Sequence, residues 1–276
     1  MSKISPSSQS DHIHHHRHPG YSYPVHIRSR IYGLVGVPLL VVLVAYLVIH
    51  QAPSTTGGQV SVVLLLEALA ASMIRLLTAY IVAVVLALPM ALLINHSSLT
   101  ERILLPMFDI LQSVPVLAFF PVIIIFFLNY HLLEGAAIFV LIISMLWSIV
   151  FSLVGGLRLV PGDVKAAAQI FGIRRTAYVR EVLIPSIFPY FVTGSLLSWA
   201  SGWNILIVAE VLHTYLPHGN RNSDLFGIGS LMVHASADGN GNLFIAAILT
   251  LVVAIAIINL TVWQRLLHYA ERFRFE

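Results

Sequence analysis

DVKAAAQIFGIRRTAYVREVLIP, residues 163–185, is a short polar interruption between two long apolar runs. Asp163 stands where a helix start favours an acidic side chain, because the helix dipole leaves the N-terminus partly positive. Ala166, Ala167 and Ala168 are the strongest helix formers, and Gly172 suits a helix end that requires a positive φ. We therefore predict a helix over 164–171 and a turn at Gly172.

The second half of this stretch, residues 176–184, is also compatible with a helix. Pro185 is expected to end that helix before the next apolar run, because proline cannot continue the helical hydrogen bonding. The predicted object is a helix, a turn and a second helix at a membrane surface, surrounded by the basic residues Arg158, Lys165, Arg174, Arg175 and Arg180. Taken alone, the alanines and a nearby glycine favour an ordinary amphipathic connector.

The composition is that of a membrane protein. The chain is 58% hydrophobic and 10% charged, whereas soluble domains carry roughly one quarter charged residues. The absence of cysteine excludes disulfides, thiolate metal sites and a cysteine nucleophile. A net charge of +3 gives no support for nucleic-acid binding, so the expected surroundings are a lipid bilayer and no nucleic acid.

Apolar segments of about 20 residues cross a bilayer as helices, because each helix satisfies its own backbone polar groups. We place six of them at about 31–49, 73–94, 110–128, 136–157, 187–212 and 243–264. The third contains Pro115 and Pro121 and is expected to be kinked or broken. Arg75, near the start of the second, is close enough to an interface to anchor there. The predicted fold class is an all-α membrane protein with six transmembrane helices.

The positions of Lys and Arg choose the orientation of these helices. With the N-terminus in the cytoplasm, all of the 15 Lys and Arg residues except Arg75 and Arg221 fall in cytoplasmic segments. The positive-inside rule therefore places both termini and the 161–185 loop in the cytoplasm. The long segment 212–242 then lies outside, and residues 225–235 within it could form a short re-entrant or surface helix.

Residues 1–30 are rich in Ser, Pro, His and Arg and have no apolar periodicity. They are too polar to be a signal peptide, and we expect a disordered, His-rich cytoplasmic tail. A metal site there is less favoured than incidental His richness, so none is assigned to His12, His14, His15, His16 and His18. Residues 31–276 form the predicted transmembrane domain, with a core over about 60–270.

Residues 163–185 resemble the EAA loop in the permease subunits of binding-protein-dependent ABC importers. That loop has Glu-Ala-Ala, three free positions, Gly, nine free positions and Ile-x-Leu-Pro. Aligned on Gly172, the spacing matches without a gap to Pro185. Ala166 stands at the position of the hallmark glutamate. Two further stretches, LQSVPVLAFFPV (111–122) and GSLLSWASGWNILIVAE (194–210), are similar to segments of importers of the nitrate, sulfonate and taurine group.

The resemblance implies a type I ABC importer permease fold (MetI-like) with cytoplasmic termini, in the plasma membrane of a prokaryote (the inner membrane if the cell is Gram-negative). It implies two ATP-binding cassette subunits, a second permease subunit that is identical or homologous, and an extracytoplasmic substrate-binding protein as partners. The chain has no phosphate-binding G-x-x-x-x-G-K-[ST] loop. We therefore expect no enzyme activity, cofactor or metal in this chain, and ATP-Mg in the partner ATPase.

ATPase coupling is implied for the loop, whose coupling helix is expected at about 163–172. The residues concerned are Asp163, Ala166, Ala167, Ala168, Gly172, Arg174, Arg175 and Pro185. Because Ala166 cannot make the charged contact of the missing glutamate, Arg174 or Arg175 could supply docking charge instead.

Polar residues within the spans are candidates for a translocation path, since intramembrane polar groups usually face the protein interior. The candidates are Gln112, Ser113, Ser198, Ser201, Asn204 and Glu210. Glu210 could serve a gate, or be hydrogen-bonded at a helix end for structure. Ser195 and the other serines of the same helix could equally bond between helices.

Two other functional classes remain open. A secondary transporter or channel would work without an ATPase, but it typically has repeated halves and no need of the loop motif. An intramembrane hydrolase would use Ser230, in Gly-Ile-Gly-Ser, with His234. The resemblance favours an importer of a small oxyanion, such as nitrate or a sulfonate, or of a small organic solute. No Lys or Arg cluster within the spans argues for an anion site.

Overall fold

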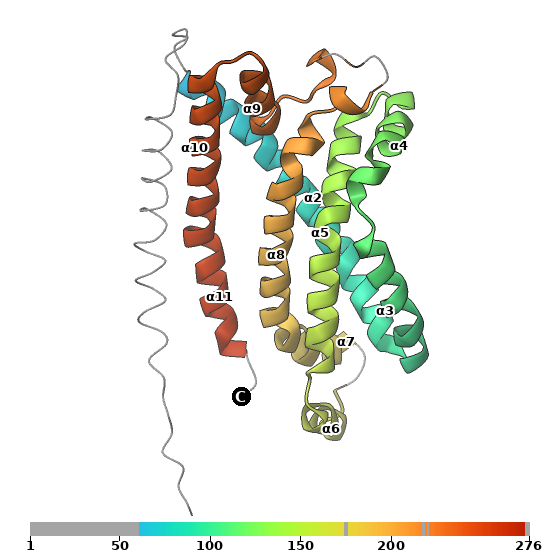
Figure 1. Cartoon of the computed structure of the whole chain (residues 1–276). Coiled ribbons are helices and arrows are strands. Elements are labelled where there is room, and N and C mark those ends of the chain that lie inside the picture. Colours follow the sequence, from blue (N-terminus) through green and yellow to red (C-terminus); the bar gives the residue numbers. More distant parts are fainter. Residues whose placement is uncertain (1–60, 174–175, 217–218, 220, 274–276) are drawn as a thin grey trace, which may run out of the picture. The chain divides into compact units, whose positions relative to one another are not determined.

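The computed structural model of the chain describes residues 61–273, apart from 174–175, 217–218 and 220. The predicted tail (1–30) and the first predicted span (31–49) lie outside these residues. Within the described part, the regular elements are all helical (Figure 1). The predicted all-α class is therefore confirmed for this part of the chain.

The α-helices are α2 (Val62–His96), α3 (Ser98–Ser113), α4 (Val116–Asn129), α5 (Leu133–Arg158), α6 (Gly162–Ile170), α7 (Thr176–Tyr178), α8 (Ile184–Glu210), α9 (Ile228–Ala237), α10 (Gly241–Ile258) and α11 (Gln264–Ala270). The π-helical turns η1 (Val179–Leu183) and η4 (Asn259–Trp263) join α7 to α8 and α10 to α11. The described residues also contain three short 3-10 turns: η2 (His213–Tyr215), η3 (Arg221–Ser223) and η5 (Glu271–Phe273).

Among the described residues, four helical segments are long and apolar enough to cross a membrane. They are Val62–Asn95, Leu133–Arg158, Val179–Glu210 and Gly241–Phe273. The pair α3 and α4 meets the same criterion only together, and its two helices are bent by 84°. The four corresponding predicted spans fall on these helices, although α2 begins well before residue 73.

The break between α3 and α4 confirms the prediction for the third span. Val114, the residue before Pro115, is extended (φ −76°, ψ 124°), as expected because a following proline disfavours the helical conformation. Pro121, in contrast, lies inside α4. Only the first of the two prolines therefore interrupts the span.

The core centres on α5, which packs against α8, α2 and α4. Small residues let α5 and α8 approach closely, as is typical of membrane helices. A Cβ at Gly156 of α5 would lie 2.6 Å from Tyr190 of α8, and one at Gly194 of α8 would lie 2.7 Å from Ser152 of α5. On α2, buried alanines recur every fourth residue at Ala79, Ala83, Ala87 and Ala91, so α2 also presents a narrow face to the core.

The prediction that Pro185 ends a helix before the fifth span is wrong. Pro185 lies in the first turn of α8, and helical structure continues through η1 into α8. The N–H of Ile184 bonds to the carbonyl of Val179, five residues earlier. At the start of an α-helix a proline loses no hydrogen bond, because that N–H has no intrahelical partner anyway. The wider π turn and the new helix start thus accommodate Pro185 without a break.

The segment between α8 and α10 contains η2, η3 and α9, and it lies at the end of the bundle opposite α6 (Figure 1). Helix α9 packs against α8, α10 and α2. The short helix predicted over 225–235 is thus present as α9. This segment brings its residues onto the ends of α2 and α8, where a buried charge cluster lies.

Candidate functional site: a projecting helix and a buried ion-pair cluster

Helix α6 and the turn after it have the predicted form. Asp163 is in the first turn of α6, and Gly172 has φ +69°. The N–H of Ile173 bonds to the carbonyl of Ala168 at 2.9 Å, which is the six-residue closure of a Schellman motif. Gly172 therefore ends α6 in the left-handed conformation that glycine adopts without strain.

The three alanines of α6 do not form one face. Ala168 is buried, Ala167 is half-buried and Ala166 is exposed. Successive helical residues are about 100° apart around the axis, so three neighbours cannot all contact the same surface. Ala168 packs toward the chain itself, and Ala166 is open to a partner.

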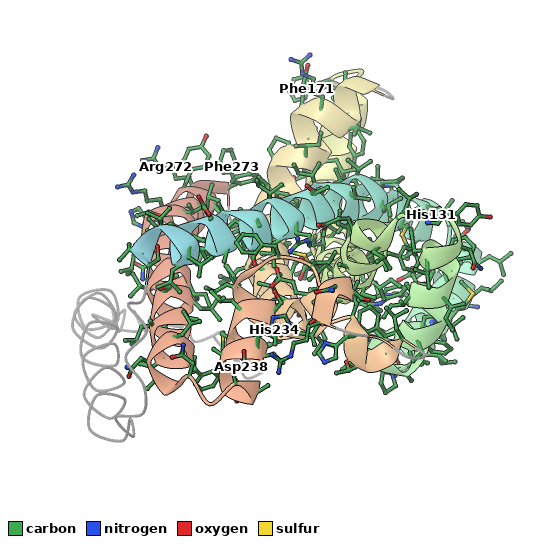
Figure 2. All side chains as sticks on the ribbon, turned by 90° about the horizontal axis from the view of Figure 1, so that it is seen from above. His131, Phe171, His234, Asp238, Arg272 and Phe273 are labelled. Carbon is green, nitrogen blue, oxygen red and sulfur yellow. The ribbon has the colours of Figure 1, made fainter. Side chains whose placement is uncertain are left out.

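The tip of α6 exposes two large apolar side chains, Ile170 (83% exposed) and Phe171 (79% exposed). Figure 2 shows Phe171 at the end of the extension, away from the rest of the bundle. Sequence reasoning missed both residues, although two large apolar residues directly before the turn glycine of a polar loop were a usable signal. An exposed apolar tip on a polar loop marks a contact surface for a partner.

A groove of about 430 Å³ lies beside α6, where the entry to α8 meets the C-terminal turn η5. It is lined by Val164, Glu181, Val182, Pro185, Ser186, Arg272 and Phe273. Pro185 thus borders the groove from the start of α8. Arg174 and Arg175, also assigned to coupling from the sequence, lie outside the described residues.

At the opposite end of the bundle, α2 and α8 are joined by a buried ion pair. Arg75 Nη1 lies 2.6 Å from Glu210 Oε1, with Arg75 5% exposed and Glu210 fully buried. Arg75 also bonds to both carboxylate oxygens of Glu134, at the start of α5, at 2.6 and 2.9 Å. One guanidinium therefore ties three helices together.

The second oxygen of Glu210 and the hydroxyl of Ser72 bind the segment between α8 and α10 (residues 211–240, called the outer segment below). Glu210 Oε2 accepts the N–H of Gly229 at 2.8 Å. Ser72 Oγ donates to Glu210 Oε1 at 2.5 Å and accepts the N–H of Ile228 at 2.9 Å. Two N–H groups in the first turn of α9, which have no partner within the helix, are satisfied in this way. The cluster thus fixes the start of α9 onto α2 and α8.

Gly227 is required beside this cluster for steric reasons. A Cβ at Gly227 would lie 2.3 Å from Glu210 Oε1, closer than any real contact. Its backbone is extended, with φ −177°, so the requirement concerns space and not conformation. The carbonyl of the preceding residue, Phe226, accepts a hydrogen bond from Arg75 Nη2 at 3.1 Å.

The structure differs from the interpretation of Arg75 as an interfacial anchor, since its guanidinium faces inward to two carboxylates. A signal was present in the sequence. Arg75 and Glu210 are opposite charges in apolar spans, and charge counting places both at the outer side. Intramembrane charges tend to pair with one another, so the two residues were candidates for a contact, although no local spacing encodes it.

The path candidates lie in different surroundings. Gln112 and Ser113 line a groove of about 310 Å³, with Ser144 and Trp147 of α5 and Ile205 of α8. Asn204 is exposed beside Ile205, whereas Ser201 Oγ bonds to the carbonyl of its own helix at Leu197.

Two of the candidates face away from any described groove. Ser198 is fully buried, and its hydroxyl has no hydrogen-bond partner among the described residues. Glu210 is enclosed in the ion-pair cluster. The structure therefore places Gln112 and Ser113 in one groove, leaves Asn204 exposed outside its lining, and buries Ser198 and Glu210 in the packed interior.

Ser230 and His234 do not form a hydrolytic pair. Ser230 Oγ donates to the carbonyls of Leu225 and Gly227, at 2.6 and 3.1 Å. His234 Nε2 instead lies 2.6 Å from Asp224 Oδ2. Burial acts to raise the pKa of Asp224, but hydrogen bonds from the backbone of His213 and from both imidazoles outweigh it and lower that pKa below its ordinary value.

A protein-family model matches most of this chain. The family described as the binding-protein-dependent transport system inner membrane component matches residues 79–269. The chain belongs to this family.

Three curated permeases illustrate the similarity. The nitrate import permease protein NrtB of Leptolyngbya laminosa is 31% identical over 144 residues, 52% of this chain and 50% of NrtB. The bicarbonate transport system permease protein CmpB of Synechococcus elongatus is 26% identical over 142 residues, 51% and 50% of the two chains. The taurine transport system permease protein TauC of Escherichia coli is 28% identical over 144 residues, 52% and 51%.

The matches span about half the length of each of these curated relatives. The predicted resemblance to permeases of the nitrate, sulfonate and taurine group is confirmed. The chain is a helical membrane component of the kind that serves transport.

Within this permease, the family match includes the features described above. Helix α6, the broken pair α3 and α4, and α8 all fall inside residues 79–269. Arg75 and Ser72 lie just before the matched region. The ion-pair cluster therefore joins a segment outside the match to Glu210 within it.

Proposed function

We propose that this chain is the membrane-spanning permease subunit of an ATP-driven importer and that α6 couples it to a separate ATPase. The observation that carries the proposal is the projecting tip of α6, with Ile170 and Phe171 more than three-quarters exposed and Gly172 turning the chain back. Apolar side chains held out on a short, well-closed helix suit insertion into a groove of another protein.

The ATPase is proposed as a separate subunit because the 276 residues contain no phosphate-binding loop. ATP-Mg would bind there and not to this chain. Two such subunits, a second permease subunit (identical or homologous) and an extracytoplasmic binding protein complete the proposed assembly. Closure of the ATPase pair on ATP would carry both coupling helices as rigid bodies and shift the membrane helices between inward-open and outward-open states.

In this proposal, α6 binds the ATPase subunit through apolar side chains and not through a glutamate. Ala166 stands where related loops have glutamate, and it is exposed without a charge to offer. Ile170 and Phe171 supply apolar area instead, of which each buried Å² contributes about 25 cal/mol. Arg174 and Arg175 would add charge beside them.

The translocation path is proposed to follow the mainly apolar groove that Gln112 and Ser113 line between α5 and α8. The break at Pro115 supports this, because non-helical backbone at membrane depth is tolerated where it lines a cavity. We assign Glu210 to holding the outer end of the bundle together, and Ser198 and Ser201 to packing of α8.

The proposed substrate is a small anion or a small organic solute, in line with the nitrate, bicarbonate and taurine that the names of the similar permeases specify. Arg75 is the cation buried in the described bundle, and Glu134 and Glu210 already engage it. Selectivity is therefore assigned to the delivering binding protein. The proposed topology has six spans and cytoplasmic termini in a prokaryotic plasma membrane, the inner membrane if the cell is Gram-negative.

The test is co-purification of the permease with candidate ATPase subunits from the same genome, followed by uptake into proteoliposomes. We expect the double substitution Ile170→Ala and Phe171→Ala to abolish both co-purification and ATP-dependent uptake. Ile74→Ala is the matched control, because Ile74 is 68% exposed on α2 and lies far from α6 in sequence. Uptake that persists without ATP or ATPase would contradict the proposal and favour a secondary transporter or channel.

A further inference from the structure

Three chemically matched side chains converge in the outer segment, apart from α6 and from the Arg75 cluster. His213 Nδ1 lies 2.7 Å from Asp224 Oδ2, and His234 Nε2 lies 2.6 Å from the same oxygen. The three ligand atoms all lie within 4.8 Å of one another. They come from η2, from the turn after η3 and from α9, so the fold and not local sequence brings them together.

We propose that His213, Asp224 and His234 form a binding site for a divalent first-row transition-metal ion, with Zn²⁺ as the reference ion. Two imidazoles and one carboxylate are a ligand set that suits Zn²⁺ and its neighbours, and harder ions such as Mg²⁺ or Ca²⁺ prefer oxygen ligands throughout. The site is distinct from the transport path, which uses none of these residues.

The carboxylate is already oriented for this role. Asp224 Oδ1 accepts the backbone N–H of His213 at 2.8 Å, and the Asp224 side chain is only 2% exposed. One oxygen is thus fixed by the backbone, and the other faces both imidazoles. Partners of this kind orient metal ligands and tune their affinity.

The spacing needs little adjustment to admit an ion. A tetrahedral Zn²⁺ with bonds of about 2.0–2.2 Å separates its ligand atoms by roughly 3.3 Å. The two N···O distances, 2.7 and 2.6 Å, would have to open by about 0.6–0.7 Å to reach this separation. Each imidazole would then carry its proton on the other ring nitrogen.

The site is also open on one side. The side chains of His213 and His234 are 25% and 28% exposed, and Figure 2 shows His234 on α9 at the surface of the bundle end. Water can therefore complete the coordination, as in zinc sites with three protein ligands. A bound ion would join η2, through His213, to α9, through His234. The residue after Asp224 connects this site to the ion-pair cluster, since the N–H of Leu225 bonds to the carbonyl of Glu210 at 3.0 Å.

The experiment measures Zn²⁺ binding to the full-length protein in detergent by competition with a chromogenic chelator. The tail histidines His12, His14, His15, His16, His18 and His26 are replaced by serine in every sample, because they would bind the ion themselves. We expect one Zn²⁺ per chain, and an affinity at least about tenfold weaker in His213→Ala, His234→Ala and Asp224→Asn. His268→Ala, a change at an exposed histidine outside the cluster, should leave the affinity unchanged.

A second variant keeps the test decisive if a ligand substitution disturbs folding. The chain has no cysteine, so His234→Cys introduces a unique thiolate in the ligand position. With Co²⁺, this variant should gain a thiolate-to-cobalt charge-transfer band that is lost again on adding Asp224→Asn. Equal Zn²⁺ affinity in all variants, or absence of the band in a folded His234→Cys protein, would overturn the proposal and leave a purely hydrogen-bonded cluster.

Discussion

At the residue scale, Arg75 and Glu210 form a buried ion pair, with side chains 5% and 0% exposed. A buried charge is costly unless it is paired and hydrogen-bonded. Both side chains meet this condition, because Arg75 is paired with Glu134 and Glu210. Glu210 receives Arg75, Ser72 and the N–H of Gly229. The pair therefore holds α2, α8 and α9 in one arrangement.

The costs of replacing the two members of this pair are expected not to add. Glu210→Gln removes the buried partner of Arg75 and leaves it only Glu134, so the cost should lie at or below the roughly 3–5 kcal/mol of an uncompensated buried charge. The double change Arg75→Met and Glu210→Gln should cost less than the sum of the two single changes. Thermal unfolding in detergent, followed by tryptophan fluorescence, measures this, with Glu67→Gln on the exposed side of α2 as the control.

Gly172 acts through backbone conformation alone. Its φ is +69°, and a Cβ there would meet nothing within 4 Å. Gly172→Val is expected to cost about 1–2 kcal/mol locally, since L-residues are strained in this conformation, and to weaken ATPase association without lowering the unfolding temperature of the bundle. Gly172→Asn should retain more association.

Gly239 provides the matched control, because it has the same φ of +69° and equally open surroundings but lies after α9. Gly239→Val should leave ATPase association intact. A pull-down with the ATPase measures all three variants. Equal loss of association in the Gly172 and Gly239 variants would show that the effect does not come from α6.

At the element scale, the core depends on the contact of α5 with α8. Neighbouring glycines on α5 have opposite surroundings. A Cβ at Gly156 would lie 2.6 Å from the ring of Tyr190, whereas one at Gly155 would meet nothing within 4 Å. The close approach of the two helices therefore depends on Gly156.

Gly156→Ala should force α5 away from α8 and cost about 1–3 kcal/mol, the usual range for overpacking. Gly155→Ala should be neutral or stabilising, because alanine is the better helix former. Thermal unfolding of the two variants in the same detergent tests this. A Gly155→Ala variant as destabilised as Gly156→Ala would contradict the described packing.

Much of the element structure could be predicted from local sequence, and long-range pairing could not. The broken third span follows from Pro115, and the end of α6 follows from Gly172, because both act on their own backbone. The ion pair joins residues 135 positions apart, and no local spacing encodes it.

The wrong prediction at Pro185 has a related cause. Proline breaks a helix when it lies in the helix interior. Pro185 instead lies in the first turn of α8, directly after the π turn η1. The exposure of Ile170 and Phe171 depends on the direction in which α6 leaves the bundle. The metal-ligand set of His213, Asp224 and His234 likewise needs three elements to meet.

At the scale of the whole molecule, α6 and α9 lie at opposite ends of the bundle (Figure 1). The charge distribution predicts, by the positive-inside rule, that the α6 end faces the cytoplasm. The assembly proposed here needs both ends, one for the ATPase and one for the binding protein. The orientation of the two ends across the membrane is therefore a property of the whole molecule, and it has to be tested at both ends.

Single cysteines report this sidedness directly, because the chain has none of its own. Ser98→Cys, at the start of α3, and Ser236→Cys, in α9, are nearly isosteric and exposed. A membrane-impermeant maleimide added to intact cells or spheroplasts should label Ser236→Cys and reach Ser98→Cys only after permeabilisation. The reverse pattern would invert the proposed topology.

The most direct measurement of the central claim is cross-linking from the tip of α6. Phe171→Cys, modified with benzophenone maleimide in the assembled complex, should cross-link to the ATPase subunit, and the yield should change on adding ATP. Ser236→Cys, at the other end, should give no such product. Absence of an ATPase cross-link from Phe171→Cys in a complex that still transports would contradict the assignment of α6 as the coupling element.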